Sequence, residues 1–116
     1  MATYSAFDVV IVPFPFTDRT ATKRRPALVL SDAAAFNDRA AHSVLAMITS
    51  AAHSAWPLDT AIADLNAAGL PSSSVVRMKV FTLDHRLILR KSGSLATIDR
   101  KAVSRALNAL LKRKAA

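Results

Sequence analysis

The sequence predicts one α+β domain, mainly β, in which a small, strongly bent antiparallel sheet or barrel carries a helix packed on it. Several short apolar segments follow one another over residues 7–89, separated by proline, glycine and polar turn residues. A helical repeat of apolar residues is clear only in the last part of the chain, from residue 97 onward. The 116 residues, 52% of them hydrophobic, suffice for a single core, so residues 1–116 are treated as one domain.

The first two strands are expected at residues 7–12 and 26–30, joined by a polar loop over residues 17–24. The second segment is a continuous apolar run, which is typical of a strand buried on both faces. Pro26 opens this strand and favours an extended backbone at Arg25, the last of three consecutive cations. The sequence therefore places a permanently charged guanidinium at the mouth of a rigid strand, where it could bind a phosphate.

The middle of the chain predicts a short helical turn and two further strands. Residues 33–41 form the helical turn, with Asn37 and Asp38 as turn residues. Residues 43–49 form a third buried strand that ends in the hydroxyl of Thr49. Residues 58–62 follow a proline and fit only a short edge strand, and residues 63–70 form a connection.

The next segment predicts a half-buried strand, because apolar and basic residues alternate from residue 76 to 80. Arg77 and Lys79 then lie on its solvent face. We expect a turn at residues 82–84, a brief pairing at residues 87–89 and another turn at residues 91–94 around Gly93.

The terminal helix is expected to begin with Thr97 or Asp99 as its cap. Its apolar residues fall at helical spacing and form one stripe, made of Val103, Ala106, Leu107, Leu110 and Leu111. Lys101, Arg105 and residues 112–114 lie off that stripe, and cations in the last turn suit the helix dipole.

The charge points to a polyanionic partner. Sixteen Lys and Arg face eight acids, all of them Asp, for a formal net charge of +8. Nucleic acid or an acidic protein segment fits such an excess. A membrane partner is not expected, because only the C-terminal helix comes near the required amphipathic pattern and residues 44–56 are too short to span a bilayer. We find no signal-peptide pattern and no cysteine, and we expect a cytoplasmic protein.

Metal and cofactor chemistry is not expected. The three histidines, His42, His53 and His85, do not fall at metal-ligand spacing, and neither Glu nor Cys is present to assist them. Two glycines are too few for a phosphate-cradling loop, and no nucleotide-binding fingerprint occurs. His53 follows Thr49 by four residues and could reach the same pocket, but we interpret it as a loop histidine.

Polar groups at strand ends form the remaining candidate site: Arg25, Thr49 and the segment of Ser74 and Arg77. Cleaving RNA without a metal requires a group that stabilises the phosphorane, a base for the 2′-hydroxyl and a proton for the leaving 5′-oxygen. Guanidinium and hydroxyl groups can stabilise such charge. The alternatives are that the cations form a solvated basic loop and that the hydroxyls cap turns at strand ends.

The ordered set of motifs resembles the MazF/PemK family of toxin endoribonucleases over essentially the whole chain, with gaps at residues 58–71. The N-terminal signature lies in residues 7–10, 13–18 and 23–31. An Asn-bearing turn at residues 37–38 and an Ile-Thr strand end at residues 48–50 follow. Residues 74–77 and 81–84 then match the Ser-Val and Thr-Leu-Asp stretches of the family.

The resemblance implies a small SH3-like β-barrel with appended helices that forms a homodimer. It implies an endoribonuclease that cuts single-stranded RNA, such as mRNA, at short specific sequences without metal or cofactor. It also implies that a cognate antitoxin inhibits this enzyme. Arg25 and Thr49 carry over as the principal catalytic pair: Arg25 stabilises the phosphorane and is a candidate proton shuttle, and Thr49 orients the phosphate. Arg77 carries over as a lesser candidate. The remaining substrate-binding candidates are Asp18, Lys23, Arg24, Ser74 and Lys79, and an acidic, partly disordered antitoxin segment is expected in the same groove.

Three departures from the family pattern affect this hypothesis. Phe7 stands in place of the usual glycine before Asp8. Thr20 stands where many members carry an acid five residues before the arginine, and Lys79 stands where some carry an aspartate. The general acid and base are therefore left open among the substrate, Asp18 and Arg25.

Two other functions stay open at this point. A non-catalytic toxin similar to CcdB, which poisons gyrase, has a similar fold but would place its key contacts in the terminal helix. The Arg-Pro strand and the Ile-Thr strand end favour the nuclease. A basic nucleic-acid-binding module without chemistry is less favoured, because one Trp and one Tyr leave little for base stacking.

Overall fold

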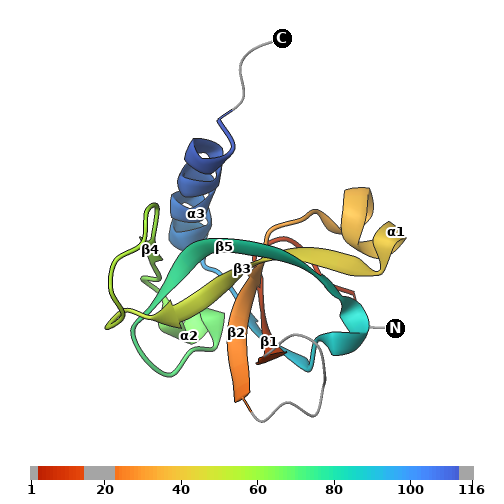
Figure 1. Cartoon of the computed structure of the whole chain (residues 1–116), viewed down its shortest axis with the longest axis horizontal. Helices are drawn as coiled ribbons and strands as arrows, with labels where there is room; N and C mark the ends of the chain where they lie inside the picture. The colour runs from red at the N-terminus through yellow and green to blue at the C-terminus, as the bar shows by residue number, and fades with distance from the viewer. Residues whose placement is uncertain (1–2, 15–22, 113–116) are drawn as a thin grey trace.

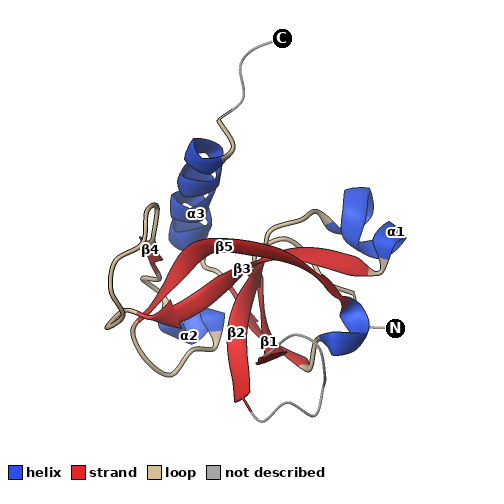
Figure 2. Cartoon of the chain, in the orientation of Figure 1, coloured by secondary structure: helices blue, strands red, loops and turns tan. Residues whose placement is uncertain are grey.

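The computed structural model of the chain describes residues 3–14 and 23–112. Its antiparallel strands form one sheet, curled into a half-barrel, in the order β4-β5-β3-β2-β1-β6 (Figures 1 and 2). The strands are β1 Asp8–Phe14, β2 Lys23–Val29, β3 His42–Ser50, β4 Thr60–Ala61, β5 Ser74–Asp84 and β6 Arg90–Ser94. The helical segments are η1 Ala33–Asn37, α1 Asp38–Ala40, α2 Leu65–Ala68, η2 His85–Leu87 and α3 Thr97–Leu110. The predicted α+β fold is thereby confirmed.

The central strands are buried on both faces of the sheet. Val9 and Leu28 pack with Val103 of α3 on one face, whereas Val10 and Ala27 pack with Tyr4 and Ile88 on the other. Ala27, Leu28 and Val29 are all fully buried, as the continuous apolar run predicts. The middle of the sheet is therefore a rigid layer between two apolar clusters.

Strand β2 begins earlier than the sequence pattern suggests. It includes the three cations, and Arg25 lies opposite Val12 of β1. On its other side β2 pairs with β3 only through Ala27–Val29. Among the described residues, its first half therefore has β1 as its single strand neighbour, which is an edge position that Pro26 tolerates. Lys23 and Arg24 consequently belong to a strand rather than to the expected loop.

Strand β5 is longer than predicted and carries a bulge. It continues to Asp84, so the turn expected at residues 82–84 lies instead at η2. Ala46 lies opposite Val80 while the next residue, Met47, lies opposite Arg77, so β5 has extra residues at this point. A bulge bends its strand and changes the direction of its side chains. Val80 is accordingly 44% exposed, although the alternating pattern places it on the buried face.

The last strand, β6, forms where the sequence pattern suggests a turn. It pairs with β1 over Asp8–Ile11. The brief pairing expected at residues 87–89 is represented by the backbone N–H of Leu89, which donates to the carbonyl of Ile11 at 2.9 Å. Gly93 permits this arrangement because a Cβ there would lie 2.4 Å from the carbonyl oxygen of Ala67 in α2. Gly69 ends α2 with φ of 69°, the left-handed conformation that glycine adopts without strain. The connection that the sequence predicts at residues 63–70 thus contains the short helix α2.

Helix α3 is confirmed, but its predicted caps are wrong. Its N-terminal cap is the backbone of Ala96, without a side-chain hydrogen bond. Asp99 is instead buried, and its carboxylate accepts hydrogen bonds from the backbone N–H groups of Ala63 (2.8 Å) and Asp64 (2.9 Å). The helix extends past the sheet (Figure 1), which leaves Leu110 and Leu111 of the apolar stripe exposed. Within the described residues, no helix is both long and apolar enough to cross a bilayer.

Candidate active site in a groove beside β2, β3 and β5

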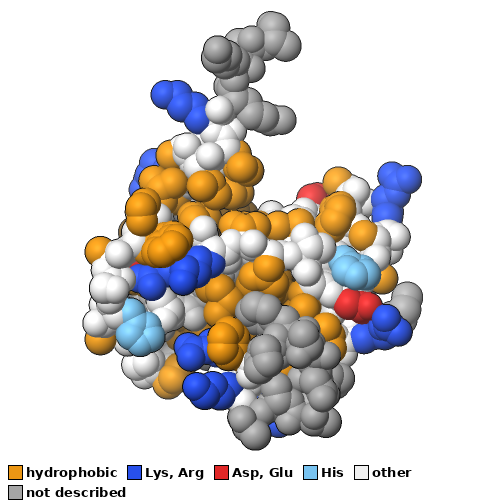
Figure 3. Space-filling model, in the orientation of Figure 1, with side chains coloured by type: hydrophobic (Ala, Val, Ile, Leu, Met, Phe, Trp, Pro, Cys, Tyr) orange, Lys and Arg blue, Asp and Glu red, His pale blue; other side chains and the backbone are white. Residues whose placement is uncertain are grey.

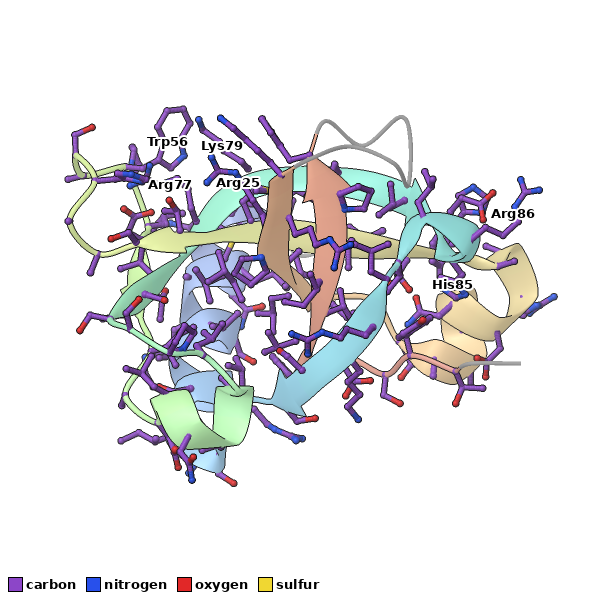
Figure 4. All side chains as sticks on the ribbon, turned by 90° about the horizontal axis from the view of Figure 1, so that it is seen from below. Arg25, Trp56, Arg77, Lys79, His85 and Arg86 are labelled. Atoms are coloured by element: carbon purple, nitrogen blue, oxygen red, sulfur yellow. The ribbon has the colours of Figure 1, made fainter. Side chains whose placement is uncertain are left out.

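An open groove of about 440 Å³ lies where β2 diverges from β3. Four of the site residues that the sequence predicts line this groove: Arg25, Thr49, Arg77 and Lys79. Phe14 of β1 and His53 of the loop after β3 also line the groove. Figure 4 shows Arg25, Arg77, Lys79 and Trp56 gathered at one end of the sheet. Residues separated by about half the chain thus converge on one solvent-accessible surface.

Strand register explains why Arg25 and Thr49 share this groove. Ala27 of β2 lies opposite Met47 of β3 in the last paired position before the two strands separate. Arg25 and Thr49 are each two residues further along in the same direction, so their side chains project from the same face as Ala27 and Met47. The strands that hold them are anchored in the core by Leu28 and Ile48. A ligand could therefore enter between two preorganised polar groups.

Arg25 has no ion-pair partner among the described residues. Its guanidinium lies 5.0 Å from the centre of the Phe14 ring, which restrains the side chain without neutralising it. A positive charge held in this way on a rigid strand is suited to binding an anion. The geometry fits a phosphate that enters the groove from solvent.

Arg77 has a different environment, because it holds the loop between β3 and β4. Its Nε and Nη2 atoms donate to the two carboxylate oxygens of Asp59, at 3.1 and 2.9 Å, and Nη2 also donates to the carbonyl of Ser54 at 2.6 Å. Arg77 is only 9% exposed, although the strand pattern places it on the solvent face. Two of its nitrogens are therefore engaged by the protein, and its main role is to anchor residues 51–59.

The ion pair of Arg77 with Asp59 predicts an acid-dependent stability. Hydrogen bonds from Arg77 hold the pKa of the Asp59 carboxyl below its usual 3.8, and partial burial opposes this shift. A lowered folded-state pKa stabilises the fold above pH 3.8, and this stabilisation is lost as the pH falls through the folded value. We expect Asp59→Asn to be less stable than wild type by a constant amount above about pH 5, and the difference to shrink below pH 3.8. Urea denaturation at several pH values measures it; a difference that grows as the pH falls contradicts the assignment.

Trp56 is an aromatic neighbour of the groove that the sequence did not single out. Its ring lies 4.6 Å from Nζ of Lys79 and 6.0 Å from the guanidinium carbon of Arg77. The ring is 43% exposed. Lys79 is exposed and has no ion pair among the described residues. A cation and a partly exposed aromatic ring therefore lie in contact at this margin of the groove, an arrangement suited to a phosphate and an adjoining base.

His53 contacts the predicted catalytic threonine. Its Nδ1 atom lies 2.6 Å from Oγ1 of Thr49, and its backbone N–H donates to the carbonyl of Ser50 at 3.1 Å. His53 is in a loop, as expected, but its ring belongs to the groove. The spacing of four residues after Thr49 was the only sequence signal for this contact.

Three other substrate-binding candidates, all among the described residues, lie outside the groove. Arg24 points to the opposite face of β2, where it lines a separate hollow with Arg90. Ser74 is buried and donates to the carbonyl of Ser72 at 2.8 Å, which matches the alternative that its hydroxyl closes a turn at a strand end. Lys23 is exposed at the start of β2, and Asp18 lies outside the described residues.

Figure 3 shows how the charged side chains are distributed over one face of the molecule. Several Lys and Arg side chains lie over β2, β3 and β5, beside one of the histidines, and others lie beside α3 and at the opposite end. The visible acidic groups lie at the other end, where Arg86 donates to Asp84 at 2.7 Å. This pairing lowers the pKa of Asp84 to about 2. Over the residues that the structure describes, no cluster of His, Cys, Asp and Glu is arranged to hold a metal ion.

Comparisons with known proteins converge on one family. The family model described as a PemK-like, MazF-like toxin of type II toxin–antitoxin systems matches residues 5–111. A search of curated proteins finds no match. The MazE–MazF complex of Deinococcus radiodurans contains a chain that is 25% identical to this one, with a TM-score of 0.74 and coverage of 98% of this chain and 100% of the other.

Two mycobacterial structures share the fold at lower identity. An endoribonuclease in complex with its cognate antitoxin, from a mycobacterial species, is 16% identical, with a TM-score of 0.75 and complete coverage of both chains. The Mycobacterium tuberculosis toxin MazF-mt6 is 18% identical, with a TM-score of 0.72 and coverage of 93% of this chain and 99% of the other.

Proposed function

This chain belongs to the family of PemK-like, MazF-like toxins of type II toxin–antitoxin systems, and we propose on that basis that it is an endoribonuclease that cuts single-stranded RNA in the groove of Arg25 and Thr49. One observation supports the location above all: an unneutralised arginine and a strand-end threonine flank the same groove at the point where β2 and β3 separate. Cleavage of mRNA by such an activity would inhibit translation and growth.

The chemistry of RNA assigns the groups their roles. The 2′-hydroxyl of the substrate attacks the adjacent phosphorus, the bond to the 5′-oxygen breaks, and the products end in a 2′,3′-cyclic phosphate and a 5′-hydroxyl. The phosphorane carries extra negative charge, which the N–H groups of Arg25 stabilise. The hydroxyl of Thr49 donates to a non-bridging oxygen and orients the phosphate, and Lys79 neutralises a neighbouring phosphate. Because guanidinium and hydroxyl groups supply this stabilisation, the proposed reaction uses no metal ion.

Sequence specificity requires contacts to bases as well as to phosphates. Phe14 contacts Arg25, Trp56 contacts Lys79, and both aromatic residues are partly exposed. Unstacked bases of single-stranded RNA pack favourably on such rings. We therefore assign base binding to these two residues and expect the loops that carry or adjoin them to set the cleavage motif.

An antitoxin and a second copy of the chain are the proposed protein partners. The relatives from Deinococcus radiodurans and from a mycobacterial species are described in complex with MazE or with a cognate antitoxin. A net charge of +8 would attract an acidic antitoxin segment, and occupation of the groove by that segment would block RNA. Ile98 and Leu110 of α3 and Leu111 directly after it leave apolar surface exposed, which is suited to a homodimer contact. We place the activity in the cytoplasm, where mRNA is translated.

The proposed function is tested by incubating the purified protein with long single-stranded RNA in EDTA and mapping the 5′ ends of the fragments. Discrete cuts at one short motif are expected. Absence of cutting by well-folded protein would contradict the proposal and favour the CcdB-like alternative, in which the toxin binds a protein target such as gyrase.

A further inference from the structure

The hydrogen bond between His53 and Thr49 holds an imidazole ring in the groove. The Nδ1 atom of His53 lies 2.6 Å from Oγ1 of Thr49, which leaves Nε2 as the other polar atom of the ring. His53 is exposed and lines the groove together with Arg25. An incoming 2′-hydroxyl could therefore reach its ring directly from solvent.

The loop that carries His53 is fixed on both sides of the residue. On one side, the N–H of Ala51 donates to the carbonyl of Ser73 at 3.0 Å. On the other, Arg77 binds the carbonyl of Ser54, the residue next to His53, and the carboxylate of Asp59. The turn that begins at Ser50 also holds the backbone of His53 itself. The imidazole is thus placed by the fold over the end of β3.

Among the described residues, the other charged groups that line the groove cannot accept a proton from the substrate. Arg25 on β2 and Arg77 and Lys79 on β5 are cations, and the described lining contains no carboxylate. The nearest acid of the loop, Asp59, accepts hydrogen bonds from Arg77 and from the backbone N–H of Trp56. Histidine is the side chain that commonly changes protonation between about pH 5 and 8. Within the described lining, His53 is accordingly the group suited to general base catalysis near neutral pH.

We propose that His53 is the general base of the RNA cleavage reaction, an inference that rests on the proposed function. Nδ1–H donates to Oγ1 of Thr49, which fixes the tautomer with an unprotonated Nε2 and turns the hydroxyl hydrogen of Thr49 toward the phosphate. Nε2 removes the proton of the 2′-hydroxyl as its oxygen bonds to phosphorus. The bond from phosphorus to the 5′-oxygen breaks, and water protonates that oxygen. The imidazolium then returns its proton to solvent.

Two substitutions of His53 distinguish a role as general base from a role in positioning Thr49 alone. His53→Asn keeps an N–H donor near the place of Nδ1 but has no proton acceptor equivalent to Nε2, and His53→Ala removes both. Single-turnover cleavage is measured for both variants between about pH 5 and 8. We expect each variant to lose at least about 100-fold in rate near neutral pH. The rise of the wild-type rate with pH should flatten in the variants, and added imidazole should partly restore cleavage by His53→Ala.

A control variant and a binding measurement show whether a loss of cleavage is specific to His53. His42→Asn removes a half-buried histidine whose Nδ1 contacts the carbonyl of Ala40 at the opposite end of β3 from Thr49, and it should cleave like wild type. The His53 variants should bind an RNA with a 2′-deoxy group at the cleaved position as tightly as wild type. Cleavage by His53→Asn within a few-fold of wild type, with an unchanged pH profile, overturns this inference alone. Failure of the wild-type protein itself to cleave RNA overturns the proposed function and the role of His53 with it.

Discussion

Arg25→Ala is expected to lower the rate of RNA cleavage by on the order of 100- to 1,000-fold while leaving the fold intact. The guanidinium is the positive charge that β2 presents to the groove, and it has no ion pair among the described residues. Its packing on Phe14 is a surface contact, so its removal should cost little stability. Single-turnover cleavage of one defined RNA measures the rate, and thermal unfolding tests the fold.

Arg24→Ala is the matched control for this prediction. It removes the same charge from the adjacent residue of the same strand, but Arg24 lies on the opposite face of β2. We expect it to cleave within a few-fold of wild type. Arg25→Lys keeps the charge and loses the planar fork of donors, so its rate should lie between those of wild type and alanine. Equal losses for Arg24→Ala and Arg25→Ala would indicate general attraction of RNA rather than a catalytic role for Arg25.

Asp99→Ala is expected to destabilise the protein by roughly 2–4 kcal/mol, because it leaves two N–H groups without their acceptor. The Asp99 carboxylate is 2% exposed and accepts from Ala63 and Asp64, so it ties the first turn of α3 to the segment after β4. In a domain of this size the midpoint of thermal unfolding should fall by about 10 °C or more. Urea denaturation gives the free energy of unfolding independently.

Thr97→Ala is the control here, since the sequence pattern offers Thr97 as a helix cap and the structure gives α3 no side-chain cap. Its effect should stay within about 0.5 kcal/mol. If Thr97→Ala is instead the more destabilising variant, Thr97 rather than Asp99 secures the start of the helix.

Local sequence patterns were sufficient to predict the strands that carry Arg25 and Thr49 and the terminal helix. Continuous apolar runs indicated the strands around Leu28 and Ile48, and helical spacing indicated α3. Since Arg25 and Thr49 sit at the ends of such runs, the sequence could suggest them as candidates. Their convergence on one groove depends on the register of β2 with β3, which no local pattern specifies.

Long-range contacts account for what the sequence could not reveal. The bulge in β5 exposes Val80, and Arg77 is covered because Asp59, in a distant loop, reaches it. Strand β6 needs Gly93 to approach α2, whereas a glycine viewed alone suggests a turn. Helix α3 uses Asp99 to bind another segment, although the same residue at a helix start is usually read as a cap.

Phe7 illustrates how the fold absorbs a departure from the family pattern. The family that the sequence resembles has glycine at this position, and Phe7 indeed adopts φ of 73°, a left-handed conformation that is strained for a bulky residue. Its ring packs at the margin of the core, and the guanidinium of Arg100 lies 5.6 Å from its centre. These contacts offset a strain on the order of 1–3 kcal/mol.

The most direct test of the central claim compares two oligonucleotides that carry the mapped cleavage motif and differ only at the 2′ position before the cut. In EDTA, the wild-type protein should cleave the all-ribose strand to a 2′,3′-cyclic phosphate and a 5′-hydroxyl, and Arg25→Ala should do so on the order of 100- to 1,000-fold more slowly. The strand with a 2′-deoxy group should bind to the wild type and stay intact. Equal cleavage of both strands, or full activity of Arg25→Ala, would contradict an active site in which Arg25 and Thr49 promote attack by the 2′-hydroxyl.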